Sequence, residues 1–250
     1  MVEGRIVVGS AVNLLKQLAD KSVGAIITDP PFHISTQRAA SWAQTRGMGN
    51  DPWTDVADID GVIEWTKPHV VEAARVIRPG GALVVMGGTQ SLIGWDMAAL
   101  KLGFRWMAEL VILWNTGKPR MGSFGSLYTR IAWYSRMGLR HTFNAEQQSI
   151  YSNVLVCDKI VMSDRHHPSE KPVGLTNFLI SLLSRSDDLI VDPFCGSGST
   201  LVSAEQTGRR WIGADTDKTA VRIANRRVRN AESEWPEPVW LWINNRLEEV

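Results

Sequence analysis

Two short segments of the sequence place an acid and a proline directly after an apolar run. The first is "AIITDPPF", in which Asp29 is followed by Pro30, Pro31 and Phe32. The second is "LIVDPFCGSGST", in which Asp192 opens a glycine-rich turn. Alone, an acid followed by proline is an ordinary way to end a strand, because proline has no N–H group and a fixed φ. The chemistry of each segment depends on what lies beside it.

The glycine-rich segment suits a nucleoside ligand. Its glycines allow the backbone to approach a ligand closely, and Asp215, at the end of the next apolar run, can accept hydrogen bonds from ribose hydroxyls. A P-loop would need a lysine after Gly198, and the dinucleotide fingerprint would need a third glycine where Leu201 stands. A nucleoside without pyrophosphate remains, and S-adenosylmethionine is the common one. Asp192 would repel phosphates and attract the ammonium or sulfonium charge of that ligand.

The proline-rich segment suits a base amine. The exocyclic amine of adenine or cytosine is a poor nucleophile, because its lone pair is delocalised into the ring, so a catalyst must hold its N–H groups with acceptors. Asp29 offers a carboxylate and Pro30 a backbone carbonyl, where two backbone N–H groups are missing. Phe32 offers an apolar face for an extruded base. The remaining task is to place amine, methyl carbon and sulfur in line.

The order of apolar segments predicts how these two segments are positioned. Helix-like and strand-like spacings alternate, which favours a largely parallel sheet covered by helices. In such a sheet ligands bind outside the carboxyl ends of the strands, and both segments follow strands at that edge. Polar residues 33–57 predict a loop over the site. The expected strands are 5–9, 25–28, 82–86, 107–114, 129–134, 189–191 and 211–214, and the expected helices are 11–19, 59–77, 90–102, 172–185 and 201–207.

Length, composition and charge limit the classes of protein to which the chain can belong. A chain of 250 residues that is 44% hydrophobic is long enough for one sizeable α/β domain. It carries no apolar run of about 18 residues and no signal-peptide pattern, which favours a cytoplasmic protein. Cys157 and Cys195 form no disulfide or zinc pattern, and His166 with His167 is too weak a pattern to predict a metal. Residues 101–140 hold seven basic residues and one acid, a segment suited either to solvent or to phosphates.

Three motifs in order, "DPPF", "HPSEKP" and "DPFCGSGST", resemble the beta class of DNA amino-methyltransferases. These enzymes use S-adenosyl-L-methionine to methylate adenine N6 or cytosine N4 in double-stranded DNA. The resemblance extends over "RVIRPGGALVVMGG" and "LGFRWMAELVILWNTGKP". It implies an α/β, Rossmann-like methyltransferase fold that is circularly permuted, with a mostly parallel seven-stranded sheet and helices on both faces. The chain would be a single domain, 1–250, with a short target-recognition region at about 136–165.

The resemblance also assigns roles to residues of this chain. Lys171 would pair with the carboxylate of the cofactor, and Ser10 stands where many members have aspartate. The amine site would be Asp29, Pro30, Pro31 and Phe32. The cofactor site would be Ser10, Asp29, Ser169, Lys171, Asp192, Phe194, Gly196, Ser197, Gly198, Thr200 and Asp215. The phosphate contacts would come from Lys118, Arg120, Arg130, Arg136 and Arg140.

The class leaves several alternatives open. Asp-Pro-Pro is usual in adenine enzymes and Ser-Pro-Pro in cytosine-N4 enzymes, so we expect an adenine-specific enzyme that flips its base, with cytosine N4 as the alternative. A catalytically inactive DNA-binding relative is a second alternative, motivated by Ser10, and methylation of RNA or a small molecule is a third. Core packing or a dimer contact explains the eleven tryptophans better than base stacking does, and members of the class are often homodimers. The expected location is the bacterial cytoplasm, for a bacterial or phage-encoded enzyme, and a restriction endonuclease partner is unknown.

Overall fold

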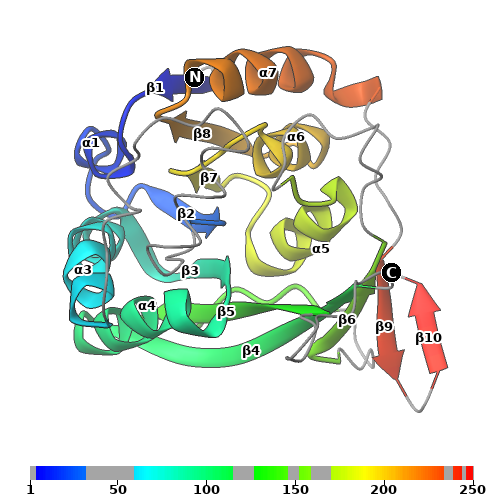
Figure 1. The fold of residues 1–250 in the computed structure, drawn as a ribbon, viewed down its shortest axis with the longest axis horizontal. Coiled ribbons are helices and arrows are strands. Elements are labelled where there is room, and N and C mark those ends of the chain that lie inside the picture. Colours follow the sequence, from blue (N-terminus) through cyan, green and yellow to red (C-terminus); the bar gives the residue numbers. More distant parts are fainter. Residues whose placement is uncertain are drawn as a thin grey trace, which may run out of the picture.

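The computed structural model describes residues 4–31, 59–114, 127–145, 152–158, 170–233, 239–243 and 246–249. At its centre lies a ten-stranded sheet (Figure 1). The strands are β1 (Arg5–Val8), β2 (Val23–Thr28), β3 (Ile77–Gly87), β4 (Phe104–Trp114), β5 (Tyr128–Arg136), β6 (Val154–Cys157), β7 (Leu189–Asp192), β8 (Arg210–Asp215), β9 (Val239–Ile243) and β10 (Arg246–Glu249). Their order across the sheet is β1-β8-β7-β2-β3-β5-β4-β6-β9-β10.

The sheet is mixed, which corrects the expectation of seven mostly parallel strands. The five strands β1, β8, β7, β2 and β3 lie in this order and run parallel to one another. Strand β5 runs antiparallel to both β3 and β4, whereas β6 is parallel to β4. Beyond β6, the antiparallel hairpin of β9 and β10 extends one end of the sheet (Figure 1). This hairpin was not predicted from the sequence, although its "VWLWI" run is rich in β-branched and aromatic residues.

Helices cover both faces of the sheet, as expected. Helices α1 (Ala11–Lys16), α3 (Ile59–Val76) and α4 (Thr89–Lys101) cover one face. Helices α5 (Val173–Leu183), α6 (Ser199–Gln206) and α7 (Lys218–Arg229) cover the other (Figure 1). All six residues of β2 are buried, because this central strand has a packed layer on each side. Within the described ranges, no helix has both the length and the apolar character needed to span a bilayer.

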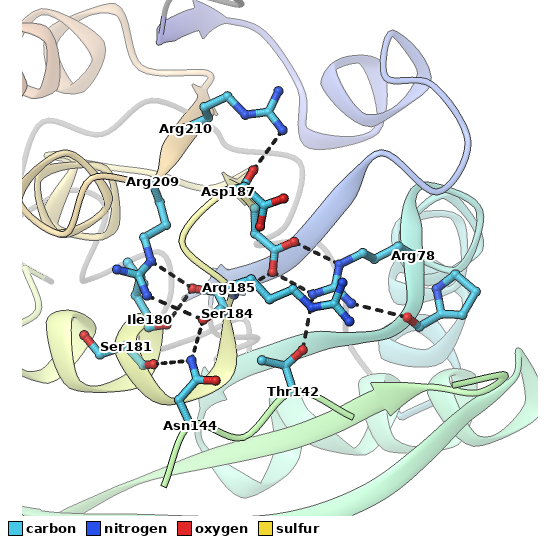
Figure 2. A network of polar contacts seen from close by, with 12 residues as sticks. Arg78, Thr142, Asn144, Ile180, Ser181, Ser184, Arg185, Asp187, Arg209 and Arg210 are labelled. Atoms are coloured by element: carbon cyan, nitrogen blue, oxygen red, sulfur yellow. Dashed lines mark hydrogen bonds and ion pairs between the residues drawn. The ribbon is translucent and has the colours of Figure 1, made fainter. Parts of the chain in front are cut away.

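A polar network fixes the edge of the sheet where the parallel strands begin (Figure 2). Arg78 of β3 forms an ion pair with Asp188, which directly precedes β7, at 2.7 Å from Nη2 to Oδ2. The same guanidinium donates to Thr142 Oγ1, and the Asn144 amide donates to the carbonyls of Ser181 and Ser184 at the end of α5. These bonds hold the chain after β5 along this edge.

This network bears on the expected target-recognition region, residues 136–165. Of that region, residues 136–145 lie along the amino ends of the parallel strands, and residues 154–157 form β6, which pairs with β4. Residues 146–151 and 159–165 lie outside the described residues. The described part of the region is therefore built into the sheet and its amino edge.

Candidate active site

The two acid-proline segments lie side by side at the carboxyl edge of the sheet. Strand β2 pairs in parallel with β7, with Ala25 opposite Ile190 and Ile26 opposite Val191. At the ends of these strands, the buried Thr28 hydroxyl donates to Asp192 Oδ1 at 2.7 Å. A parallel register brings segments that are far apart in sequence to one edge, as the sequence predicted. The part played by Thr28 was missed, although a hydroxyl at the end of a buried strand needs a partner.

Asp192 is a buried carboxyl at the mouth of the glycine loop. Its Oδ1 also accepts a hydrogen bond from the Phe194 amide at 3.1 Å. Burial raises the pKa of Asp192 to about 7, although the hydrogen bonds from Thr28, Thr200 and the Phe194 amide act in the opposite direction. The negative charge of Asp29 adds to the rise in pKa. A cation placed beside Asp192 would therefore favour its ionised form.

The glycine loop between β7 and α6 has a backbone that needs glycine. Gly196 and Gly198 have φ of 51° and 89°, in the left-handed region. A Cβ added to Gly198 would lie 2.8 Å from the Cβ of Ala224 on α7, so this residue also permits close packing of the loop. The Gly196 amide donates to Asp215 Oδ2 at 2.9 Å, and Asp215 Oδ1 accepts from the Asp217 amide at 2.9 Å.

These features fit a nucleoside cofactor. Asp215 lies at the tip of β8, is half-buried and fixes the loop, and each carboxylate oxygen has a second lone pair for a ribose hydroxyl. Ser10, expected at the cofactor, lies at the carboxyl end of β1, where its Oγ accepts from the Asn13 amide at 3.4 Å and caps α1. Ser169 lies outside the described residues.

Asp29 forms an ion pair with Lys171 through its Oδ2. In the structure this lysine pairs with the acid of the amine site, and its expected contact with the carboxylate of the cofactor stays a prediction. Both side chains are mostly buried, with 17% of Asp29 and 12% of Lys171 exposed. Pro30 is buried and Pro31 half-buried, whereas Phe32 lies outside the described residues. The motif "HPSEKP" thus reaches the amine site through Lys171.

A second ion pair, which the sequence analysis missed, lies behind the glycine loop. Arg227 of α7 and Glu170 approach to 3.0 Å, and each side chain is only 3% exposed. Ser197 Oγ donates to Glu170 Oε2 at 3.2 Å, and Arg227 Nη1 donates to the Ser197 carbonyl at 3.2 Å. Helical spacing could have found it, because Arg227 falls among the apolar positions of α7 that include Ala224 and Val228.

An aromatic cluster supports the loop from the opposite face of the sheet. The Phe194 ring lies 5.9 Å from the Trp65 ring and 5.3 Å from the His69 ring, both on α3. His69 Nδ1 lies 2.9 Å from the Trp65 carbonyl, and its ring is 6.1 Å from that of Trp95 on α4. Helix α3 therefore packs directly against Phe194, and α4 supports it through His69. The helical spacing of apolar residues does not reveal this role.

The described residues that were expected to contact phosphates lie at two opposite edges of the sheet. Arg130 lies beside Gly87 at the carboxyl edge, and its ion pair with Glu109 raises its pKa. Arg136 lies at the opposite edge, where its guanidinium donates to the carbonyls of Ala74 and Gly103. Arg140 is exposed at that same edge, with its carbonyl close to Gly80. Lys118 and Arg120 lie outside the described residues. Among the described residues, no group of three or more His, Cys, Asp or Glu could hold a metal ion.

The model of the DNA methylase family matches residues 23–226, which include both acid-proline segments. The chain therefore belongs to this family, the class that methylates the N6 or N4 amine of bases, as the sequence predicted. S-adenosyl-L-methionine is the methyl donor of the class.

Particular relatives agree with this assignment. The chain is 26% identical over 237 residues to the type II methyltransferase M2.DpnII of Streptococcus pneumoniae, covering 88% of this chain and 87% of that one. It is 27% identical over 254 residues to the type II methyltransferase M.HinfI of Haemophilus influenzae, covering 90% and 68%. Among solved structures, the fold resembles the cytosine-N4-specific PvuII DNA methyltransferase with a TM-score of 0.73 at 19% identity, covering 91% and 86%. It also resembles M1.HpyAVI in its complex with SAM, with a TM-score of 0.66 at 21% identity, covering 90% and 98%.

Proposed function

We propose that this chain transfers the methyl group of S-adenosyl-L-methionine to the N6 amine of an adenine flipped out of double-stranded DNA. The observation that carries this proposal is the hydrogen bond between Thr28 and Asp192, which joins the amine site to the glycine loop. The cofactor supplies an electrophilic methyl group on a sulfonium when it is bound at that loop. Asp192 would face its positive charge, and Asp215 would accept hydrogen bonds from its ribose hydroxyls.

Asp29 and Pro30, which follow β2, hold the base amine beside the glycine loop. The Asp29 carboxylate and the Pro30 carbonyl accept its two N–H groups, which turns the nitrogen lone pair toward the methyl carbon. With the cofactor bound, the amine nitrogen would take its methyl group and leave the bond electrons on sulfur. The surplus proton of the amine would pass to the Asp29 carboxylate that already accepts that N–H, and from there to solvent.

Lys171 stabilises the negative charge of Asp29 in this arrangement. A carboxylate has about four lone-pair positions, so Asp29 can accept from Lys171 and from the amine together. With the lysine on one oxygen, the acid presents acceptors of fixed direction to the base. The contact with the cofactor carboxylate that the family resemblance implied stays a separate prediction.

The choice of adenine rests on Asp29, because serine is usual at this position in cytosine-N4 enzymes. Cytosine N4 is the second candidate, favoured by the fold likeness to the PvuII enzyme. For DNA contacts we propose the carboxyl edge, where Arg130 lies and where the connection carrying Lys118 and Arg120 begins and ends. The two ends of that connection meet at this edge, since the Trp114 amide donates to the Leu127 carbonyl at 2.8 Å.

Three finer expectations belong to the same proposal. The order of the motifs, with the amine site ahead of the cofactor loop, supports a circularly permuted single domain. Met97 and Leu100, exposed on α4, favour a homodimer. The kinship with bacterial enzymes favours action in the bacterial cytoplasm.

The test is transfer of labelled methyl groups to DNA, RNA and free nucleosides, followed by digestion and mass analysis. The proposal predicts N6-methyladenine from double-stranded DNA alone. N4-methylcytosine as the product would select the second candidate, and transfer to RNA or nucleosides in preference to DNA would contradict both.

A further inference from the structure

Helix α7 carries several arginines, and one of them differs from the rest. Arg222, Arg226 and Arg229 are exposed, as expected for cations on the outer face of a helix. Arg227 is 3% exposed and lies with its guanidinium behind the glycine loop. Burial of a charge is costly unless it is paired and hydrogen-bonded, so this arginine needs a specific explanation.

Arg227 contacts three residues on the cofactor side of the site, Glu170, Ser197 and Ser199. Its Nη1 lies 3.0 Å from Glu170 Oε1 and donates to the Ser197 carbonyl and hydroxyl, both at 3.2 Å. The same nitrogen donates to Ser199 Oγ at 3.4 Å. Ser197 in turn donates to Glu170. Helix α7, the glycine loop and the "HPSEKP" motif are therefore joined at one buried point.

We propose that Arg227 is a positioning residue for cofactor binding. Ser197 lies between Gly196 and Gly198, whose permissive backbone gives the loop little rigidity of its own. The guanidinium and Glu170 hold this serine by both its carbonyl and its hydroxyl. Glu170 also precedes Lys171, the partner of Asp29, so the same pair fixes the chain that reaches the amine site. The inference goes beyond the proposed function, because it concerns the cofactor loop whichever base is methylated.

The test compares cofactor binding with stability in matched variants. Arg227→Met removes the buried charge, and Arg226→Met removes an exposed charge from the next position. Binding of S-adenosylhomocysteine, measured by calorimetry without DNA, should weaken about tenfold or more in Arg227→Met. It should weaken less in Arg227→Lys and stay within about twofold in Arg226→Met. Where DNA is methylated, the KM for S-adenosylmethionine should rise by a larger factor than kcat falls.

A double variant separates positioning from mere stability. Glu170→Met with Arg227→Met removes both charges, so it should recover much of the resistance to urea that either single change loses. The proposal predicts that cofactor binding stays weak, because Ser197 has lost both of its partners. If the double variant regains stability and affinity together, or if Arg227→Met binds as the unmodified protein does, the proposal is wrong. If Arg227→Met does not fold, Arg227→Lys and the double variant decide by the same criteria.

Discussion

Asp29 has two neighbours that act on its charge in opposite ways. Lys171 pairs with it, and the negative charge of Asp29 is close enough to the carboxyl of Asp192 to raise the pKa of Asp192. The lysine therefore offsets part of the repulsion between two neighbouring carboxylates. The pair explains why an acid, rather than a neutral turn residue, can end β2 at this edge.

Replacement of Asp29 separates catalysis from cofactor binding. We expect Asp29→Ala to lower kcat by at least about 100-fold, because the amine loses the acceptor that turns its lone pair toward the methyl group. Binding of S-adenosylhomocysteine, measured by calorimetry, should stay within about threefold, since Asp215 and Asp192 hold the amides of the glycine loop. An equal loss of binding and turnover would show that Asp29 mainly builds the cofactor pocket.

The raised pKa of Asp192 predicts that stability and cofactor affinity depend on pH. The pKa of its buried carboxyl is raised from an ordinary 3.8 to about 7, so the folded protein holds a proton there that the unfolded chain has already lost. This group therefore destabilises the fold progressively as pH rises from about 4 to 7. A bound sulfonium favours the ionised form, so S-adenosylmethionine should bind about tenfold more tightly at pH 8 than at pH 6.

The control for this prediction is Asp192→Asn, which removes the titrating group and keeps its size. Its cofactor affinity should be weaker and should change little between the two pH values. Calorimetry in buffers of different ionisation enthalpy should show proton release on binding near neutral pH in the unmodified protein. An affinity that is flat with pH in the unmodified protein would contradict the assignment of Asp192.

At the scale of elements, the close packing of the glycine loop against α7 can be tested with alanine variants. Gly198 has φ of 89° and lies against Ala224, whereas Gly208 has φ of 71° with nothing within 4 Å of an added Cβ. Both alanine variants carry the cost of a left-handed backbone, about 1–3 kcal/mol. Gly198→Ala should lose roughly a further 1–3 kcal/mol, because its methyl group overlaps α7. Urea unfolding of the two variants measures the difference, and equal losses would mean that the close approach has no energetic consequence.

The sequence predicted the elements that follow local patterns. Alternating apolar runs predicted β2, β7, β8 and the helices between them, and the parallel register then brought Asp29 and Asp192 to one edge. The first helix and strand were expected slightly longer, and β3 begins earlier, because "RPGG" continues the strand through Gly80 rather than making a turn before it. Element ends depend on tertiary pairing, which a local pattern does not contain.

The pairings across the site were harder to predict. Nothing in the motif "HPSEKP" tells whether Lys171 meets Asp29 or the cofactor, because that depends on where the segment lies in space. Arg136 looked like its basic neighbours in sequence, yet the antiparallel course of β5 carries it to the edge away from Asp29. The direction of a strand decides this, and the direction of β5 follows from its pairing with β3 and β4.

At the scale of the whole molecule, the two edges of the sheet differ in function: one carries the candidate active site, and the other carries a stabilising polar network. The carboxyl edge carries Asp29 and the glycine loop, and the amino edge carries the network around Arg78 and Asp188 (Figure 2). Only 15% of the Arg78 side chain and 7% of the Asp188 side chain are exposed. Arg78→Met should therefore cost about 3–5 kcal/mol of unfolding free energy, because it leaves a buried carboxylate without its main partner.

The matched control is the exposed pair of Lys67 and Glu64, at 3.9 Å with side chains 61% and 72% exposed. Lys67→Met should change the free energy of unfolding by less than about 1 kcal/mol. Urea unfolding measures both variants. A loss as small in Arg78→Met as in Lys67→Met would show that the amino edge does not depend on this network.

The central claim is that the edge formed by Asp29 and the glycine loop methylates adenine in DNA. Sequencing of modified bases in DNA from cells that express the protein, beside cells that express Asp29→Ala at the same level, tests it most directly. We predict N6-methyladenine within one recurring short sequence in the first cells and its absence in the second. Equal methylation in both, or N4-methylcytosine as the modified base, would contradict this account.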